Sequence, residues 1–208
     1  MDERCTTFIR RNNYKTIYKM IIGLTGKKGC GKSSVARIIA EQYNYGIKSF
    51  ATPIKLMLSA MGLSNDELYD PKKKEDIIPE FGKSPRELMQ LLGTEFGRTL
   101  VSQNIWVTSL EKHLDNGKNY VIDDVRFANE AAMIRAHDGV IVRVVRGLDD
   151  SPDEHISEAG INSELINYEI QNISCYETDL QNEVNQVLEE ILYYGAIRDS
   201  KSKSIAGQ

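Results

Sequence analysis

The sequence of 208 residues predicts an α/β fold, in which helices cover both faces of a parallel sheet. Three observations lead to this prediction. Short apolar runs such as KMIIGLT, NYVIDDV and GVIVRVV alternate with helical patterns. The first run passes through a glycine-rich turn directly into a helical pattern. The runs are short and largely apolar, as strands buried on both faces are.

The expected elements follow in order along the chain. Strands are predicted at residues 19–25, 47–50, 119–125 and 139–145, with a weaker one at 168–173. Helices are predicted at residues 32–43, 53–62, 84–98 and 128–139, and residues 64–83 are predicted to be a polar loop. A final helix is predicted from the apolar spacing of Leu180, Val184, Val187, Leu188, Ile191 and Leu192.

Composition and net charge indicate which partners and which cellular setting to expect for the protein. The formal net charge is −4, so no general attraction to nucleic acid is expected. No run of about 18 apolar residues predicts a membrane span. The three cysteines and three histidines are scattered and form no zinc spacing, which favours a reducing, cytoplasmic setting. Residues 1–19 are expected to be a flexible basic extension, with a transit peptide as the alternative, and residues 196–208 a disordered tail.

A phosphate-binding loop is predicted at residues 26–33, GKKGCGKS, which meet the pattern G-x-x-x-x-G-K-[ST]. Its glycines allow backbone N–H groups to surround phosphate oxygens, and the helix that follows adds the partial positive charge of its N-terminus. A lysine here reaches the β- and γ-phosphates of ATP, and the next hydroxyl binds Mg²⁺. The predicted ATP-binding residues are Gly26, Gly29, Gly31, Lys32, Ser33 and Ser34.

Two acids, Asp123 and Asp124, end the predicted strand at 119–125. The carboxyl edge of a parallel sheet is where ligands bind, so a carboxylate there could hold Mg²⁺ through water. We expect one of the two to be functional and the other to cap the turn. Arg126 is expected to point into the same cleft, with a surface salt bridge as the alternative. Glu130 opens the next helix, where the helix dipole alone favours a carboxylate.

The segment SPRELMQLLGTEFGR predicts a helix with a capping box, made by Ser84 and Glu87. At 100° per residue, one side gathers Leu88, Leu91, Leu92 and Phe96, and the other side gathers Arg86, Gln90, Gly93, Thr94 and Gly97. Small and polar residues on the second side favour a ligand-binding face, with packing against another helix as the alternative. Trp106 begins the next helix and could either stack on a base or belong to the core.

Absent motifs and abundant arginines narrow the class of nucleotide-binding protein. The sequence has neither N-K-x-D nor L-S-G-G-Q, which argues against switch GTPases and transporter-type ATPases. Guanidinium groups bind phosphate in bidentate fashion. A small-molecule kinase with a phosphorylated acceptor is therefore favoured by the arginines expected around the cleft: Arg86, Arg98, Arg126, Arg143 and Arg146.

The segments GLTGKKGCGKSSVA, SFATPIK, PRELMQLLGTEFGR, VIDDVRFANEAAMIRAHDGVIVRVVR and DEHISE together resemble the deoxynucleoside monophosphate kinases of tailed bacteriophages. The resemblance covers residues 20–195 and implies a three-layer P-loop kinase fold with a central five-stranded parallel sheet. It implies a helical acceptor-binding insertion at about 51–115 and a lid at about 146–165. The sequence departs from the family pattern in its amino-terminal extension and at Ala128, where proline is frequent.

The same resemblance implies roles for individual residues. Lys32, Asp124, Arg126, Arg143 and Arg146 would be catalytic, the last two as lid arginines, and Ser33 and Asp124 would bind the metal. The acceptor would be bound by Gln90, Gly93, Thr94, Trp106, Asp124, Arg126 and Glu130. Arg86 and Arg98, two of the arginines expected around the cleft, are predicted to bind it as well.

The expected reaction is transfer of the ATP γ-phosphoryl group to a deoxynucleoside 5′-monophosphate, with Mg²⁺. No general base is needed, because the acceptor phosphate is already an anion. The alternatives are a kinase for another phosphorylated acceptor, such as a relative of dephospho-coenzyme A kinase, and a nucleotide-binding regulator without turnover. The expected partners are small molecules, and a homodimer is left open.

Overall fold

The computed structural model describes residues 20–115, 117–147, 161–174 and 176–206. The predicted extension at 1–19, most of the predicted lid and the DEHISE segment lie outside the described residues. For residues 196–206 only the course of the helix is described.

The centre of the fold is a five-stranded parallel sheet, as the sequence predicted. Its strands are β1 (Ile21–Thr25), β2 (Gly46–Lys48), β3 (Tyr120–Ile122), β4 (Val140–Val145) and β5 (Tyr168–Gln171). Their order across the sheet is β2-β3-β1-β4-β5. Ile22 of the central strand β1 is in register with Val121 on one side and Val140 on the other. All five residues of β1 are buried, which explains the short, continuously apolar run in the sequence.

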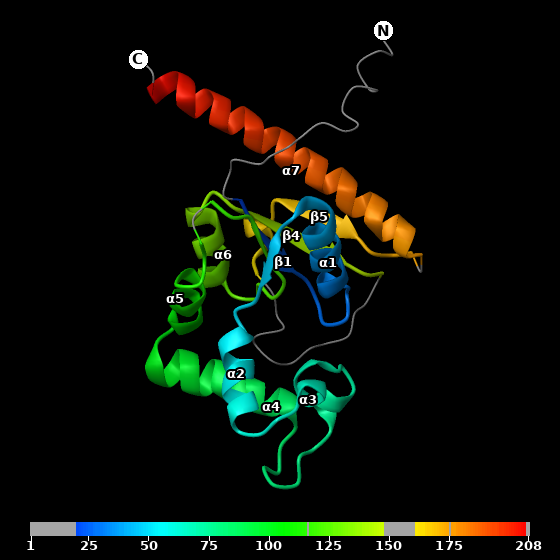
Figure 1. Cartoon of the computed structure of the whole chain (residues 1–208), viewed down its shortest axis with the longest axis vertical. Coiled ribbons are helices and arrows are strands. Elements are labelled where there is room, and N and C mark those ends of the chain that lie inside the picture. Colours follow the sequence, from blue (N-terminus) through cyan, green and yellow to red (C-terminus); the bar gives the residue numbers. More distant parts are fainter. Residues whose placement is uncertain (1–19, 116, 148–160, 175, 207–208) are drawn as a thin grey trace.

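Helices cover both faces of the sheet, so the fold has the predicted three layers (Figure 1). On one face, α1 (Lys32–Tyr43) and α7 (Glu177–Ala206) bury Ile39 and Leu188 against Ile22 and Leu24. On the other face, a second cluster joins Ile21 and Ile122 to α2 (Thr52–Ala60), α5 (Ile105–Glu111) and α6 (Ala128–Ala136). Alternate residues of β1 thus enter different cores, as the two-residue period of a strand requires.

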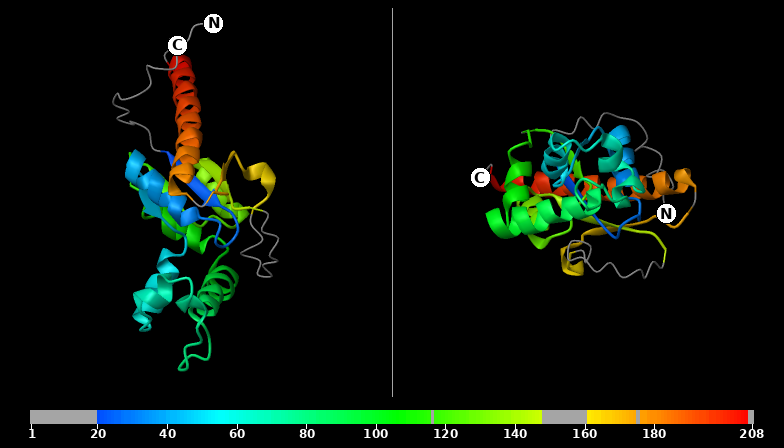
Figure 2. Two further views of the ribbon diagram at one scale, coloured as in Figure 1. Left: turned by 90° about the vertical axis from the view of Figure 1, so that its right-hand side faces the viewer. Right: turned by 90° about the horizontal axis from the view of Figure 1, so that it is seen from below.

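The chain between β2 and β3 forms a helical region below the sheet, on the side away from the end of α7 (Figures 1 and 2). It contains α2, α3 (Asn65–Tyr69), the 3₁₀ turn η1 (Lys73–Glu75), α4 (Pro85–Gln90), the π-helix η2 (Leu91–Val101) and α5. A capping box at Ser64 and Glu67 starts α3 inside the stretch that the sequence predicted to be a polar loop. A second short 3₁₀ turn, η4 (Ser163–Leu165), precedes β5.

The predicted regular helix over residues 84–98 is wrong in its second half. The capping box of Ser84 and Glu87 is present and α4 is α-helical, but residues 91–101 form the π-helix η2. Bonds from i to i+5 put more residues in each turn, so the 100° wheel fails there. Two residues of the predicted apolar side, Leu91 and Phe96, are 38% and 43% exposed.

The last helix extends further than the sequence predicted. Disorder was expected from residue 196, whereas α7 continues to Ala206. Residues 196–206 contain neither glycine nor proline. Once a helix has formed, adding one more residue costs little free energy. A polar segment without a helix breaker can therefore continue the helix. No helix in the described part of the chain combines the length and apolarity that crossing a membrane requires.

Candidate active site

A cavity of about 270 Å³ lies where the phosphate loop, the end of β3 and the helical region meet. It joins residues that are up to 98 positions apart in the sequence, from Lys32 to Glu130. The sequence-predicted residues in its lining are Lys32, Ser33, Arg86, Gln90, Gly93, Thr94, Arg98, Trp106, Asp124, Arg126 and Glu130. One cavity therefore contains both the lysine of the phosphate loop and the predicted acceptor face.

The phosphate loop has the backbone that its glycines predicted. Gly26, Gly29 and Gly31 all have positive φ, at 140°, 78° and 102°. A Cβ on Gly26 would lie 2.3 Å from the carbonyl oxygen of Val144, so no other residue fits there. Gly31 precedes α1, whose first turn has no side-chain cap and no acidic residue. The first N–H groups of α1 are thus available to a phosphate.

Lys32 folds back over the loop. Its Nζ donates to the carbonyl oxygens of Gly26 at 2.6 Å and Lys27 at 2.8 Å. The pKa of Lys32 is lowered, chiefly because the ammonium is buried. Cys30 partly opposes this shift, and the positive charge of Arg126 adds to it. Ser33 and Ser34 are exposed at the start of α1, and Ser33 also lines the cavity.

Asn172, a residue that the sequence analysis did not identify, supports the loop from the far edge of the sheet. It directly follows β5, is buried, and its amide donates to the carbonyl oxygen of Cys30 at 2.9 Å. A Cβ on Gly31 would lie 2.3 Å from its Nδ2 atom. Only its position after a strand could have indicated it in the sequence.

The two predicted lid arginines lie apart from the cavity lining. Arg146 is exposed, and its Nη1 lies 3.4 Å from the carbonyl oxygen of Gly29, beside the phosphate loop. Arg143 is inside β4, in register with Thr25 and Glu169, rather than at the strand's end. The structure thus places Arg146 beside the phosphate loop and Arg143 within the sheet.

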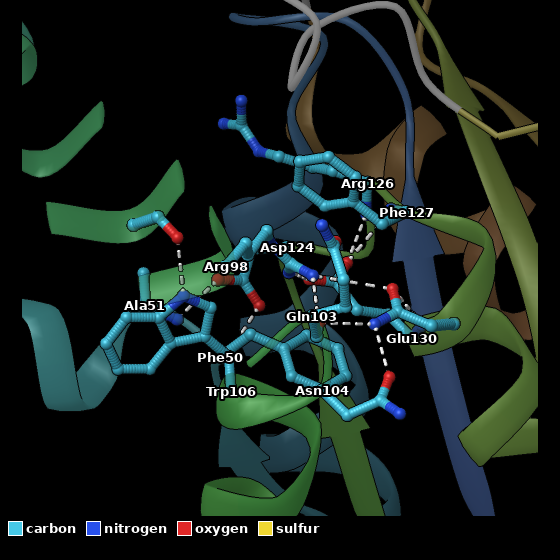
Figure 3. A network of polar contacts seen from close by, with 12 residues as sticks. Phe50, Ala51, Arg98, Gln103, Asn104, Trp106, Asp124, Arg126, Phe127 and Glu130 are labelled. Atoms are coloured by element: carbon cyan, nitrogen blue, oxygen red, sulfur yellow. Dashed lines mark hydrogen bonds and ion pairs between the residues drawn. The ribbon is translucent and has the colours of Figure 1, made fainter. Parts of the chain in front are cut away.

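Asp123 and Asp124 lie in different environments (Figure 3 shows Asp124). Asp124 accepts hydrogen bonds from the hydroxyl of Ser49 at 2.6 Å and from the backbone N–H groups of Phe50 and Ala51, both at 2.9 Å. It therefore fixes the turn between β2 and α2. Burial raises the pKa of Asp123 to about 6, and the charge of Asp124 contributes. Lys55 and Lys32 oppose that rise, so Asp123 faces the cationic part of the cavity.

Arg98 and Glu130 form a buried ion pair, with Nη2 and Oε1 2.5 Å apart and exposures of 6% and 2% (Figure 3). The other carboxylate oxygen of Glu130 accepts from the backbone N–H groups of Arg126 and Phe127. The guanidinium of Arg98 lies over the ring of Phe127, 3.9 Å from its centroid. Burial raises the pKa of Glu130 to about 7, with Asp124 contributing. This pair orders the segment that carries Arg126.

Asn129, which the sequence analysis did not single out, adds to this network. Its amide nitrogen donates to the carbonyl oxygen of Gln103 and to the Asn104 side chain, each at 2.9 Å. The start of α6 is thereby tied to the segment between η2 and α5 (Figure 3). Within VIDDVRFANEA, the side chains of Asp124, Asn129 and Glu130 therefore position the backbone around Arg126.

Trp106 belongs to the core and also borders the cavity. It is 4% exposed, and its indole N–H donates to the carbonyl oxygen of Gly93 at 2.7 Å. A Cβ on Gly97 would lie 2.3 Å from Cζ2 of Trp106, whereas one on Gly93 would meet only Ile54 Cδ1 at 3.2 Å. The two glycines of the predicted ligand face thus differ: Gly97 admits the indole ring, and Gly93 lines the cavity.

The described residues contain no group of three or more histidines, cysteines or acids that could hold a metal ion by themselves. The cavity does offer hard oxygen donors beside Lys32, namely the Ser33 hydroxyl and the Asp123 carboxylate. Mg²⁺ prefers such donors together with substrate phosphates and water. The residues present therefore fit a magnesium ion that arrives with a nucleotide.

The chain is similar in sequence to two viral proteins. A protein of Acanthamoeba polyphaga mimivirus, provisionally described as a deoxynucleotide monophosphate kinase, is 29% identical over 188 residues, which are 82% of this chain and 91% of that protein. The deoxynucleoside-5′-monophosphate kinase of Escherichia phage T5 is 37% identical over 117 residues, which are 52% of this chain and 47% of that protein. The chain thus matches about half the length of the T5 protein.

Among solved structures, dephospho-CoA kinase from Campylobacter jejuni aligns with 83% of this chain and 97% of its own, at 16% identity and a TM-score of 0.46. The family model for deoxynucleotide monophosphate kinase matches residues 72–182, just over half of the chain and including α4, η2 and the segment from β3 to β5. The chain belongs to the deoxynucleotide monophosphate kinase family.

Proposed function

We propose that the protein transfers the γ-phosphoryl group of ATP to the 5′-phosphate of a deoxynucleoside monophosphate, giving a diphosphate and ADP. The observation that carries this proposal is the single cavity, which joins Lys32 of the phosphate loop to Gln90, Gly93 and Thr94 of the acceptor face. Two nucleotides with facing phosphates need such a shared space. Family membership supports the same reaction.

The residues of the phosphate loop would hold ATP. Backbone N–H groups from Gly29 to Ser33 would surround the β-phosphate, and Lys32 would exchange its loop carbonyl partners for phosphate oxygens. A positive charge near the γ-phosphate offsets the charge that develops on the transferred group. Arg146, beside Gly29, would add a second cation on the outer side of the loop.

Ser33 and Asp123 would hold Mg²⁺, the second directly or through water. When bound, the ion neutralises phosphate charge and orients the phosphate oxygens. Asp123 is a better candidate than Asp124, because the Ser49 hydroxyl and two backbone N–H groups already occupy the Asp124 carboxylate. Asp124 would then act by fixing the turn that leads into α2.

The acceptor would lie between α2 and η2, with its base near Gln90, Gly93 and Thr94. Its phosphate would point toward Arg126 and Arg86, which line the same cavity. Arg98 and Glu130 would not contact the phosphate directly, because their charges satisfy each other. They would instead position Arg126, whose N–H is bound to Glu130.

The test is a panel of acceptors with ATP and Mg²⁺: the four common deoxynucleoside monophosphates, the four ribonucleoside monophosphates, dephospho-coenzyme A, and water alone. Product nucleotides are separated by chromatography, and ADP is measured in parallel. We expect diphosphate formation from at least one deoxynucleotide and little ADP without an acceptor. Turnover of dephospho-coenzyme A alone, or ATP binding without any turnover, would replace the proposal by one of the two alternatives.

A further inference from the structure

Besides Lys32 and Arg98, four cationic side chains line the cavity, and they come from four different elements. They are Lys55 on α2, Lys74 on η1, Arg86 on α4 and Arg126 after β3. The acids in the lining are Asp123, Asp124 and Glu130. Asp124 is bonded to the turn before α2, and Glu130 to Arg98. Asp123 is therefore the lining acid that remains available to these cations among the described residues.

Glu75, the neighbour of Lys74, joins the phosphate loop to α4. Its Oε1 accepts from Nζ of Lys28 in the phosphate loop at 2.7 Å and from Nε of Arg86 at 2.6 Å. One residue of η1 thus contacts both the donor side and the acceptor side of the site. These contacts fix the position of η1, and hence of Lys74, relative to the phosphate loop.

A hydrogen-bonded turn precedes Lys74. Oδ1 of Asp70 accepts from the backbone N–H groups of Lys72 at 2.7 Å and Lys73 at 3.1 Å, and the N–H of Lys74 donates to the carbonyl oxygen of Asp70. Lys72 and Lys73 are exposed, whereas Lys74 is half-buried and lines the cavity. The sequence run DPKKKED, predicted to be a polar loop, therefore directs one of its three lysines inward.

The ammonium of Lys74 makes no hydrogen bond or ion pair with any residue that the structure describes. Burial lowers its pKa to about 8, and Lys55, Arg86 and Arg126 contribute, with Asp123 opposing. On α3, which packs against η1, Asp66 faces Lys73 and Glu67 bonds to Ser64. On α4, Glu87 is bonded to Ser84. An anion in the cavity would relieve the repulsion among these cations.

We propose that Lys74 binds the 5′-phosphate of the acceptor nucleotide, and that Glu75 positions it by joining Lys28 to Arg86. This inference rests on the proposed function and adds a binding residue from a segment that carries no recognised motif. A phosphate dianion between Lys74, Arg86 and Arg126 would receive charge from three directions. The half-buried ammonium then gains the partner that it lacks in the described structure.

The proposal has a consequence for pH dependence. A phosphate monoester loses its second proton near pH of about 6, so the acceptor stays a dianion above neutrality. Lys74 is charged below its pKa of about 8 and loses its proton above it. kcat/KM for the acceptor should therefore decline as the pH rises through about 8 in the wild type. An arginine at this position stays protonated and should remove that decline.

The experiment compares wild type with Lys74→Ala, Lys74→Arg and the matched control Lys72→Ala, an exposed lysine of the same turn. Steady-state rates are measured from pH 7 to 9.5 with the accepted deoxynucleotide. Calorimetry measures binding of that monophosphate and of its unphosphorylated deoxynucleoside, with a non-hydrolysable ATP analogue in the phosphate loop. We expect Lys74→Ala to weaken monophosphate binding by about 10- to 100-fold, the effect of one charge-assisted hydrogen bond.

Binding of the deoxynucleoside should change little in Lys74→Ala, and Lys72→Ala should resemble wild type. Lys74→Arg should retain activity at pH 7 and lose the decline above pH 8. Equal weakening of nucleoside and monophosphate would mean a structural role and would overturn the assignment, as would wild-type kinetics in Lys74→Ala. A wild-type enzyme that uses no deoxynucleotide would instead overturn the proposed function itself, and this inference with it.

Discussion

The indole N–H of Trp106 donates to the carbonyl oxygen of Gly93, 13 positions earlier in the chain, at 2.7 Å. This bond joins the buried core of the helical region to the face that lines the cavity. Four residues further along η2, Gly97 leaves the space in which the indole ring lies. The position of the acceptor face thus depends on a side chain of the next helix.

Replacing Gly97 by alanine should destabilise the protein. Its Cβ would lie 2.3 Å from Cζ2 of Trp106 and 2.9 Å from the carbonyl oxygen of Leu92, and neither can move easily. Overpacking of this kind costs about 1–3 kcal/mol, which exceeds the gain of about 1 kcal/mol from alanine in a helix. Urea unfolding measures the difference. Gly93→Ala is the matched control: it should keep the stability and raise KM for the acceptor. Equal unfolding midpoints for wild type and Gly97→Ala would contradict this account.

Asp123→Asn should make the protein more stable at pH 7 while reducing turnover. The folded-state pKa of Asp123 is about 6, above its ordinary 3.8, so the folded state favours the protonated form. The stability due to this group is complete below pH of about 4 and is lost as the pH rises through 6. Asparagine removes the buried charge and should add about 1–3 kcal/mol at pH 7. Unfolding without nucleotide or Mg²⁺ measures this, and the gain should shrink toward pH 4.

Asp124→Asn should have the opposite effect on stability. The asparagine amide keeps one acceptor oxygen, but it carries no charge. It therefore cannot accept charge-assisted hydrogen bonds from both N–H groups and the Ser49 hydroxyl. Loss of charge-assisted hydrogen bonds should cost about 1.5–3 kcal/mol. Turnover measured across a Mg²⁺ titration distinguishes the two acids: Asp123→Asn should need more Mg²⁺, and Asp124→Asn should not. The reverse result would return the metal role to Asp124.

Arg98→Met should strongly destabilise the protein, because it leaves Glu130 buried without its cation. Breaking a buried pair on one side costs about 3–5 kcal/mol. Combining it with Glu130→Gln should cost less than the sum of the single changes, because the amide still accepts from the N–H of Arg126. A double-mutant cycle in urea gives the coupling. Strictly additive effects would show that the pair contributes nothing as a pair.

Lys32→Ala should abolish phosphoryl transfer without unfolding the protein. The hydrogen bonds of Lys32 all stay within its own loop, to two carbonyl oxygens and to the sulfur of Cys30, and burial disfavours its charge. Removing it therefore costs the fold little but deprives the γ-phosphate of its nearest cation. Circular dichroism and thermal unfolding check the fold, and ADP release at saturating ATP checks the activity. Normal turnover would remove Lys32 from the mechanism.

Much of the fold and part of the site could be predicted from local patterns. The buried strand β1 is a largely apolar run because it is covered on both faces. The glycines of the loop after it predicted the positive φ angles that the loop adopts. Gln90, Gly93 and Thr94 share the polar side of the predicted helix, which the sequence predicted to face a ligand, and they do line the cavity. These signals all arise within a single element.

What could not be predicted depends on contacts between elements. Asp123 and Asp124 are equivalent in the sequence, and only the Ser49 hydroxyl and the N–H groups of the next turn distinguish them. Asn172 lies 142 positions from Cys30, to which it bonds. The exposure of Leu91 and Phe96 follows from the π-helix, which no periodic pattern in the sequence indicates. In the sequence, nothing distinguishes Lys74 from the exposed Lys72 and Lys73, because only the folded chain places it in the cavity lining.

The π-helix makes the acceptor face sensitive to chain length. Its N-terminal side is fixed by the Ser84 cap and its C-terminal side by the Arg98–Glu130 pair. An insertion or deletion of one residue between these two anchors would interconvert π and α pairing and rotate Gln90, Gly93 and Thr94 relative to one another. Such a change leaves the chemical composition of the face almost intact. We therefore expect a single-codon insertion or deletion in this helix to change which base the proposed acceptor site takes, without substitution of any residue that lines the cavity.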